Sequence, residues 1–383
     1  MSEIEDSRFY EGRHLGEPVV EHRPGSPEEL RELVEGSEEA ERAMVILGGG
    51  EHLRASALGE RSFDVVRTDR CNRLRGLDLD SNTARVEAGL TWSGLQEKLA
   101  KKDRSVQRYG LYPANATIGG LLARWQPLEK QLNRGDVRDG CIALRTASPA
   151  GADYSYLAAP RKASGPDSRF LYVGGEGALG VILEATLVVQ PRFPGRLLAF
   201  EAASIGAAVA AFRRLARLDM RATWCRWCRS EEVFEAAMRA PDALLDGYMR
   251  RLRSETKEGF ETSDGAAVDE RREAIESTHV GGRSSQAANR TWEVVWRLSD
   301  LAEAVDGLGD RVDDVVVHDW GLHWARAYVI ADEEDAEFGA SEAPFPEALM
   351  VRKVVDEGEG VWPAWTQRLK AELDPMGSLA VGP

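Results

Sequence analysis

Four glycines between residues 171 and 189 give the chain a backbone that can approach a flat cofactor or a pyrophosphate closely. They stand in LYVGGEGALGVILEATLVV, between two apolar runs rich in β-branched residues. Glycine lacks a Cβ atom, so it takes positive φ values and leaves room for a ligand beside the main chain. The pattern predicts a tight turn, after which Val181 and Ile182 begin a strand. The glycines are Gly174, Gly175, Gly177 and Gly180.

A second glycine loop, Gly48-Gly49-Gly50, follows a short apolar strand expected at Met44–Leu47. Upstream, Ser26–Ala43 is predicted to be a helix, because Ser26 is a good N-cap, proline fits the first helical position and glutamates fill the first turn. A strand followed by a glycine loop is a geometry in which successive backbone N–H groups can surround a phosphate. A triple glycine is also common in plain turns, so the loop alone leaves both interpretations open.

A third segment, YGLYPANATIGGLLAR, combines a hydroxyl with paired glycines at Thr117, Gly119 and Gly120. The hydroxyl can donate to a phosphate or flavin oxygen, and the glycines admit close approach. The same residues also fit a helix N-terminus with Thr117 as its cap. Both roles can hold at once.

The three segments together resemble the FAD-linked oxidases of the vanillyl-alcohol oxidase type, which have a PCMH-type FAD-binding domain. The similarity lies in Ile46–His52, in ATIGG, and in PRKASGPDSRF ahead of the GGEGALG turn, while WTQRLKAELDPMGSLAVGP resembles the family's C-terminal tail. The matches are dense before residue 190 and sparse between 195 and 360. Within the family, the chain is most like the FAD-binding subunit of glycolate oxidase.

The resemblance implies that backbone groups of these segments bind FAD. The expected cofactor-binding residues are Ile46, Leu47, Gly48, Gly49, Gly50, Glu51, His52, Pro113, Ala116, Thr117, Ile118, Gly119, Gly120, Arg124, Glu176, Gly177, Ala178, Leu179, Gly180, Val181 and Ile182. Family members with a covalent histidyl bond place the histidine directly after the first glycines. Here Glu51 stands in that place and His52 follows it, so we expect non-covalent FAD.

The expected fold class is α+β, with a two-lobed PCMH-type FAD-binding domain and a cap domain of antiparallel sheet plus helices. The expected divisions are an N-terminal extension at 1–26, the FAD-binding domain at 27–194, the cap or substrate domain at 195–360, and a tail at 361–383 that returns to the FAD domain. Within the cap, the apolar spacing predicts helices at Ser204–Met220 and Glu231–Arg253, the latter broken at Pro241. Strands are expected at Thr291–Leu298, Val312–Val317 and Trp324–Ile330, with helices packed on one face of their sheet.

Composition limits the kind of partner that the chain can bind. Its 383 residues carry a formal charge of -15, which repels nucleic acid and anionic lipid. The sequence starts without a basic, apolar leader and has no apolar run long enough to span a membrane, so we expect a cytoplasmic protein.

Four cysteines do not make a disulfide framework. The pair in WCRWC, Cys225 and Cys228, could be redox-active or metal-binding, but buried structural thiols beside Trp224 and Trp227 are the favoured interpretation.

With FAD bound, the protein has to supply a base for a substrate hydroxyl and a positive charge for a substrate carboxylate. Candidate bases are His318 and His323 of HDWGLHW, whose odd spacing on a strand would point them to opposite faces. Arg283, near His279, is the candidate carboxylate ligand. No metal motif is present, and no metal is expected.

The resemblance implies an FAD-dependent oxidoreductase acting on CH–OH groups, such as a glycolate or D-2-hydroxy-acid oxidase subunit. Such subunits bind a small hydroxy acid and work beside a second flavoprotein and an iron–sulfur subunit. The bulky, charged stretch after Gly120, LLARWQPLEKQLNRGDVRD, departs from the family and fits an accessory subunit. A self-sufficient hydroxy-acid or alditol oxidase and a non-catalytic flavin-fold scaffold stay open as alternatives.

Overall fold

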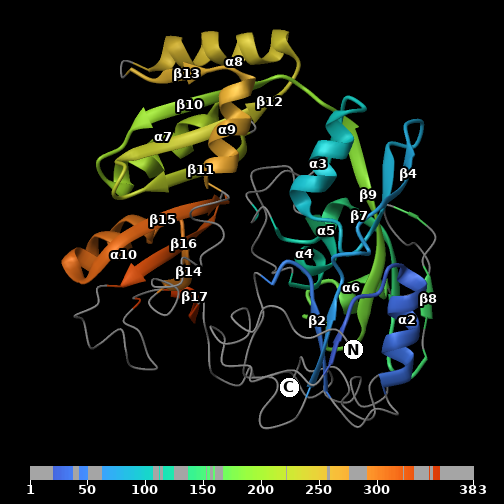
Figure 1. Cartoon of the computed structure of the whole chain (residues 1–383). Coiled ribbons are helices and arrows are strands. Elements are labelled where there is room, and N and C mark those ends of the chain that lie inside the picture. Colours follow the sequence, from blue (N-terminus) through green and yellow to red (C-terminus); the bar gives the residue numbers. More distant parts are fainter. Residues whose placement is uncertain are drawn as a thin grey trace.

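The chain folds as an α+β protein in which two sheet systems lie side by side (Figure 1). The computed structural model describes residues 20–37, 43–50, 63–106, 112, 115–124, 137–151, 153–155, 158–159, 167–220, 222–256, 259–275, 291–321, 323–331, 345 and 348–353. Within these residues, no helix is long and apolar enough to cross a bilayer. The expected tail at 361–383 lies outside them.

The first lobe is a small parallel sheet with one helix. Its strand order is β1-β3-β2, formed by β1 (Val20–His22), β3 (Phe63–Arg67) and β2 (Ala43–Leu47). Helix α2 (Pro27–Glu35) begins as predicted, since Ser26 Oγ accepts a hydrogen bond from the Glu29 N–H at 3.1 Å. The predicted end at Ala43 was wrong. The helix stops before Gly36, and Ala43 pairs with Phe63 in the sheet.

The second lobe is an antiparallel sheet centred on the long strand β9 (Val181–Pro191). The strand order is β4-β5-β9-β7-β8, and β6 also pairs with β9. The other strands are β4 (Leu74–Asp78), β5 (Thr83–Glu87), β6 (Arg104–Val106), β7 (Cys141–Ala147) and β8 (Asp153–Ser155), and the helices are α3 (Trp92–Ala100), α4 (Ile118–Arg124), α5 (Val137–Gly140) and α6 (Arg169–Tyr172). The apolar run before the glycine turn forms the helical turn α6, and the strand after the turn is where it was predicted.

The cap is an antiparallel sheet of eight strands in the order β13-β10-β12-β11-β15-β16-β14-β17. These are β13 (Glu261–Ser263), β10 (Gly195–Glu201), β12 (Val233–Arg239), β11 (Ala222–Cys228), β15 (Val312–Trp320), β16 (Trp324–Ala331), β14 (Thr291–Arg297) and β17 (Ala348–Lys353). Its helices are α7 (Ile205–Arg217), α8 (Asp242–Glu255), α9 (Gly265–Ile275) and α10 (Leu301–Leu308), with a 3-10 turn at Gly309–Arg311.

Two expectations for the cap were wrong. Residues Val233–Arg239 form a strand, although Glu, Ala and Met favour helix, because β12 pairs with β10 along one edge and with β11 along the other. Helices also cover both faces of the sheet. The side chains of α7, α8 and α10 pack on one face in the large apolar core, and Val268 and Ile275 of α9 pack on the opposite face.

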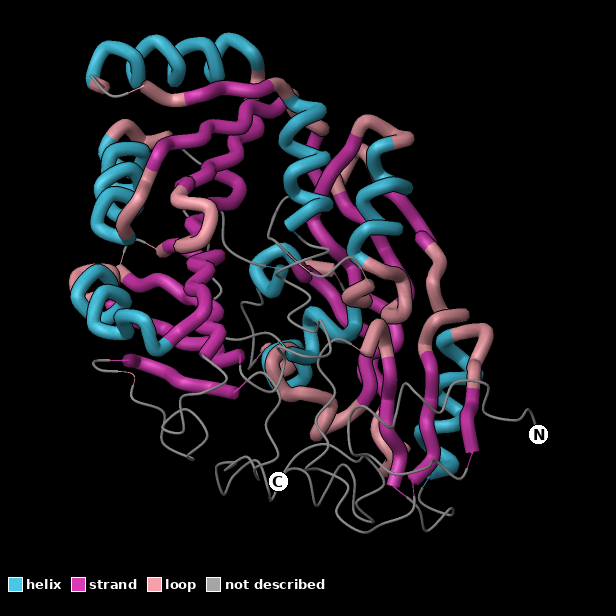
Figure 2. Tube along the Cα trace, turned by 60° about the vertical axis from the view of Figure 1, so that its left-hand side comes forward, coloured by secondary structure: helices cyan, strands magenta, loops and turns pink. Residues whose placement is uncertain are grey.

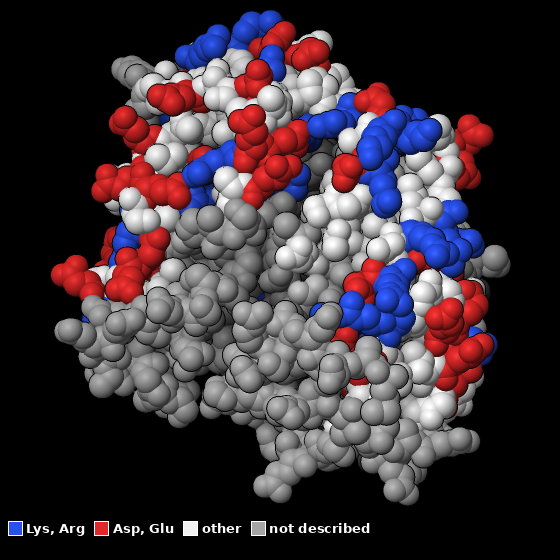
Figure 3. Space-filling view, viewed as in Figure 1, with Lys and Arg blue, Asp and Glu red and all other residues white. Residues whose placement is uncertain are grey.

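The two faces of the cap sheet have different neighbours. Figures 1 and 2 show α7 and α10 on the side of the sheet that is away from the first and second lobes, and α9 on the side that faces them. We call the latter the inner face and the former the outer face. Charge is also unevenly spread, because Lys and Arg gather over α3 and the neighbouring strands while Asp and Glu are spread over the visible side of the cap (Figure 3).

A short linker, residues 192–194, joins β9 to β10. The Arg192 N–H donates to the Asp103 carbonyl at 3.0 Å, on the side of the lobes. On the cap side, Arg192 Nη2 bonds Asp269 at 3.0 Å, and Arg239 Nη1 donates to the Phe193 carbonyl at 3.2 Å. The linker is therefore held from both domains.

Candidate active site

The Gly48–Gly50 loop leaves the end of β2 and packs directly against the segment that precedes α4. A Cβ atom on Gly48 would lie 2.3 Å from Thr117 Oγ1, and one on Gly49 would lie 1.9 Å from the Asn115 carbonyl oxygen. Gly50 has a φ of 73°, a value that favours glycine. Gly49 is therefore required by a contact between two main chains, and Gly48 by its contact with the Thr117 side chain.

The segment before α4 is held in place by the backbone after β5. The Trp92 N–H donates to Ala116 O at 2.8 Å, the Ile118 N–H to Leu90 O at 2.9 Å, and the Gly119 N–H to Ala88 O at 2.8 Å. Thr117 Oγ1 accepts a hydrogen bond from the Gly120 N–H at 3.2 Å, so the predicted capping role of Thr117 is confirmed. These bonds fix the segment that faces Gly48.

The turn at Gly174–Gly180 binds the other end of the same helix. The Gly174 N–H donates to Leu122 O at 2.9 Å and the Glu176 N–H to Ala123 O at 2.8 Å. Positive φ values at Gly174, Glu176 and Gly177, between 48° and 82°, bend the chain. The buried Arg169, in the helical turn α6 that precedes these glycines, holds the segment against β7. Its guanidinium bonds Asp167 and donates to the Cys141 carbonyl oxygen at 2.9 Å.

Three glycine segments that are far apart in sequence thus form one continuous surface around α4. Glycine-lined backbone of this kind can approach a pyrophosphate or a flat ring without collision. Of the expected cofactor residues, Glu51, His52 and Pro113 lie outside the described part of the chain. The others lie at this surface or next to it: Ile46 and Leu47 close β2, Ala116 to Gly120 and Arg124 belong to α4 and its start, and Ala178, Leu179, Val181 and Ile182 lead into β9. The arrangement fits FAD, and the role of each residue stays a prediction.

The inner face of the cap sheet carries a second group of polar side chains. On β16, Ala325, Ala327 and Val329 belong to the outer core, so the alternation of a strand turns Arg326 and Tyr328 to the inner face. His318 of β15 stacks on Tyr328 with ring centroids 4.3 Å apart and an interplanar angle of 17°. Arg326 is 2% exposed and His318 is 6% exposed. A guanidinium, an imidazole and a phenol therefore share one buried region.

The sequence did not single out Arg326 and Tyr328. The alternation of WARAYVIA could have done so, because three small or aliphatic residues mark one face and the arginine and tyrosine the other. His323, a predicted base, is exposed and lies in the β15–β16 turn beside α7, on the outer side. Arg283 and His279 are outside the described residues.

A network of charges supports the part of the inner face that α9 covers. Arg226 of β11 is fully buried, and its guanidinium bonds Glu231 at 2.7 Å and Glu235 at 3.3 Å. Arg271 of α9 bonds the same two carboxylates. The hydrogen bonds from Arg226 lower the pKa of Glu231 to about 2. The network ties α9 to the sheet.

The four cysteines are buried and unlinked. Burial raises the pKa of Cys71 and of Cys141 to about 12, and it raises the pKa of Cys225 and Cys228 as well. Cys225 lies in the outer core beside Trp227, whereas Cys228 Sγ bonds Asp314 at 3.3 Å. The expectation of buried thiols is confirmed, and no group of three or more metal-ligating residues occurs within the described residues.

Comparison with known proteins identifies the glycine-lined surface. Residues 18–152 match the family described as FAD binding domain. Residues 18–152 form an FAD-binding domain. It contains the Gly48–Gly50 loop and the start of α4, and FAD is its cofactor.

Several FAD-linked relatives are similar over part of the chain. D-lactate dehydrogenase [cytochrome] of Arabidopsis thaliana is 28% identical over 48% of this chain and 34% of its own length. Alkyldihydroxyacetonephosphate synthase of Caenorhabditis elegans is 26% identical over 47% and 31%. D-2-hydroxyglutarate dehydrogenase of Xanthomonas citri pv. viticola is 24% identical over 81% and 66%. The chain thus spans about a third of the length of the first two relatives.

The fold of the whole chain is also found in solved structures. An alkyldihydroxyacetonephosphate synthase superposes with a TM-score of 0.73 at 16% identity, covering 94% of this chain and 76% of that protein. The coverage includes the cap, so the antiparallel sheet beside the FAD domain is part of the shared architecture.

Proposed function

We propose that the protein is an FAD-dependent oxidoreductase that dehydrogenates a small 2-hydroxy acid. The observation that carries the proposal is the buried group of Arg326, His318 and Tyr328 on the cap face that is turned toward the FAD domain. Two relatives, D-lactate dehydrogenase and D-2-hydroxyglutarate dehydrogenase, are named for such substrates.

Each side chain of this group has a part that suits its chemistry. The planar guanidinium of Arg326 binds the substrate carboxylate with two parallel hydrogen bonds. His318 accepts the hydroxyl proton, because imidazole changes its protonation near neutral pH. The stack on Tyr328 holds the imidazole plane in a fixed orientation. Bound FAD supplies a hydride acceptor.

The glycine segments position FAD, and we propose that they bind it without a covalent bond. The N–H groups of Gly174 and Glu176 already donate to α4, so the glycines serve FAD mainly by letting the backbone approach it closely. The other two predicted catalytic residues, His323 and Arg283, are not part of the inner-face group.

We further propose a cytoplasmic protein that acts as the FAD-binding subunit of a glycolate oxidase, next to a second flavoprotein and an iron–sulfur subunit. The departure after Gly120 supports this assignment.

The first experiment is an absorbance spectrum of the purified chain before and after acid precipitation, with added FAD if the protein is colourless. Flavin bands that move to the supernatant support non-covalent FAD. A chain that stays colourless with excess FAD contradicts the proposal and supports a scaffold role.

The second experiment measures reduction of a dye acceptor with a panel of D- and L-2-hydroxy acids and with matching alcohols that lack the carboxylate. Arg326→Gln should raise KM for the acids about 10- to 100-fold, because a hydrogen bond to a charged group contributes about 1.5–3 kcal/mol. The alcohols should be unaffected. Arg297→Gln, on the exposed end of β14, is the matched control. An equal loss for acids and alcohols, with flavin content unchanged, would refute the role of Arg326.

A further inference from the structure

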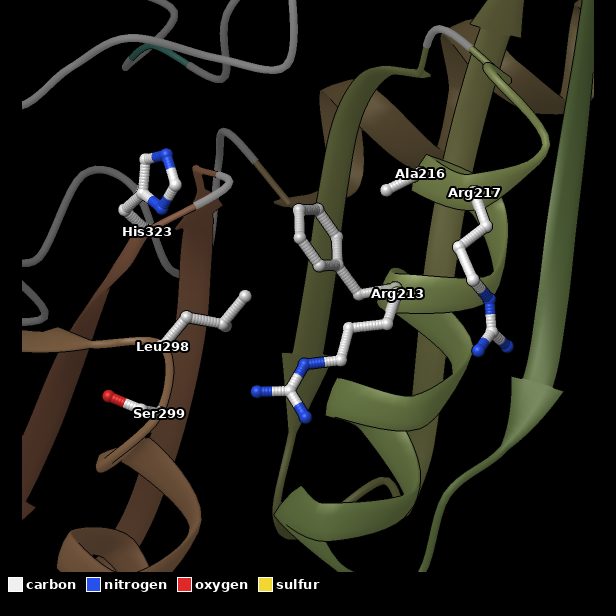
Figure 4. Close-up of a pocket in the computed structure, with 7 residues that line it drawn as sticks. Arg213, Ala216, Arg217, Leu298, Ser299 and His323 are labelled. Atoms are coloured by element: carbon white, nitrogen blue, oxygen red, sulfur yellow. The ribbon is translucent and has the colours of Figure 1, made fainter.

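A pocket of about 550 Å³ lies on the outer side of the cap, away from the inner-face group. Its lining combines apolar side chains, Phe212, Ala216 and Leu298, with polar ones, Arg213, Arg217, Ser299 and His323, and Figure 4 shows Leu298, Ser299 and His323 facing helix α7. Its volume falls in the range of small-molecule sites, roughly 300–1,000 Å³. Helix α7, the end of β14 and the β15–β16 turn supply its walls.

The pocket is separate from the proposed active site. Phe212 belongs to the outer core together with α10, and the centroid of its ring lies 5.1 Å from that of Trp320. Arg326 is on the inner face, so the sheet lies between it and the pocket. The wall at Leu298 is fixed, because the Leu298 N–H donates to the His323 carbonyl at 2.9 Å. The backbone of this wall is therefore held in place by the neighbouring turn.

The polar lining is basic in a strongly acidic protein. Arg213 and Arg217 lie one turn apart on α7 and are exposed, and neither has an ion pair or hydrogen bond with a described residue. Figure 4 shows the Arg213 guanidinium extending from α7 toward Ser299. None of the described lining residues carries a carboxylate, and the adjacent Asp300 accepts a hydrogen bond from the Ser299 hydroxyl at 2.7 Å. Arginines held at the mouth of an apolar pocket favour an anion with a hydrophobic body.

We propose that this pocket binds a small organic anion, with a carboxylate or phosphate attracted by the positive charges of Arg213 and Arg217 and an apolar body against Ala216 and the exposed edge of Leu298, while the fully buried Phe212 lies beneath them. Ser299 and His323 add hydrogen-bonding groups on the opposite wall. The inference does not depend on the proposed dehydrogenase activity, because none of these residues belongs to the inner-face group.

The test uses the full chain saturated with FAD and isothermal titration calorimetry with phenyl phosphate, an anionic head on an apolar ring. Benzyl alcohol is the neutral comparison. Phenyl phosphate should bind with a dissociation constant below about 1 mM, and benzyl alcohol should bind at least about tenfold more weakly. The double variant Arg213→Gln/Arg217→Gln should weaken phenyl phosphate binding at least about tenfold, since it removes both charge-assisted contacts.

Two further variants separate this pocket from other sites. Arg250→Gln/Arg253→Gln removes two exposed arginines from α8 and should leave the affinity unchanged. Ala216→Leu keeps both charges but fills the apolar floor, so it should also weaken binding. All variants should keep the flavin content and melting temperature of the parent protein. Absence of phenyl phosphate binding, or equal binding by the parent and the Arg213→Gln/Arg217→Gln protein, would overturn the proposal.

Discussion

Replacing Gly49 by alanine should disrupt the FAD site through packing alone. The added Cβ would lie 1.9 Å from the Asn115 carbonyl oxygen, whereas real Cβ contacts stay above 3.0 Å, so the two segments must separate by at least about 1.1 Å. The obstacle is main chain held by the hydrogen bonds around Ala116, and it cannot rotate away as a side chain could. Overpacking of this kind costs about 3 kcal/mol, the upper end of its usual range.

The cost can be measured as a melting temperature together with the flavin content. For a domain of this size, about 3 kcal/mol lowers the melting temperature by roughly 6–12 °C. FAD content should fall as well, because the displaced segments are those expected to bind the cofactor. Gly36→Ala is the control, since its φ of -77° suits alanine and no atom lies within 4 Å of the new Cβ. If Gly49→Ala melts and binds FAD like Gly36→Ala, the reasoning about close approach is wrong.

Three further predictions concern stability and reactivity. Ser204→Ala removes the hydroxyl that caps α7 and should destabilise the protein by about 1 kcal/mol in urea unfolding, whereas Ser204→Asp should restore the cap. The hydrogen bond from Arg226 lowers the pKa of Glu231 from 4.5 to about 2, so the contribution of Glu231 to stability is complete above pH 4.5 and is lost as the pH falls toward 2. Glu231→Gln should therefore flatten the dependence of the melting temperature on pH between these values. An unchanged slope would contradict the assignment. The four cysteines, Cys71, Cys141, Cys225 and Cys228, are buried, so the disulfide reagent dithiobis(nitrobenzoate) should react slowly with the native protein and with all four thiols after unfolding. Rapid labelling of the native protein would contradict this prediction.

The sequence predicted best where the local signal and the tertiary contacts agree. Ser26 was predicted to be a helix cap, and it accepts the expected amide hydrogen bond. Ser204, where the next predicted helix starts, accepts one in the same way. Thr117 was predicted to be a cap followed by paired glycines, and the structure gives the reason for the first of them. A Cβ atom on Gly119 would lie only 2.8 Å from the Cβ atom of Ala88. Glycine spacing alone could not show that three distant loops meet around α4.

The sequence failed where pairing between strands outweighs local propensity. Residues 233–239 have the composition of a helix and form the central strand β12. The inner-face group was also missed, because no motif in the sequence distinguishes Arg326 from the other arginines. Its burial becomes evident only when both faces of its strand are known to be covered. Its neighbours on β16 decide its direction, and that depends on which face of the sheet α7 covers. The alternation of WARAYVIA separates the two faces of the strand, but it does not show which of them is turned toward the lobes.

The linker at residues 192–194 has a mechanical consequence. Its main chain is bonded to Asp103 on one side, and on the other side the Ala240 N–H donates to Pro194 O at 3.2 Å, while Arg239 bonds both Phe193 and Asp269. Hinge motion here has to break several hydrogen bonds at once, so the junction acts as a stiff elbow that sets the angle between the two domains.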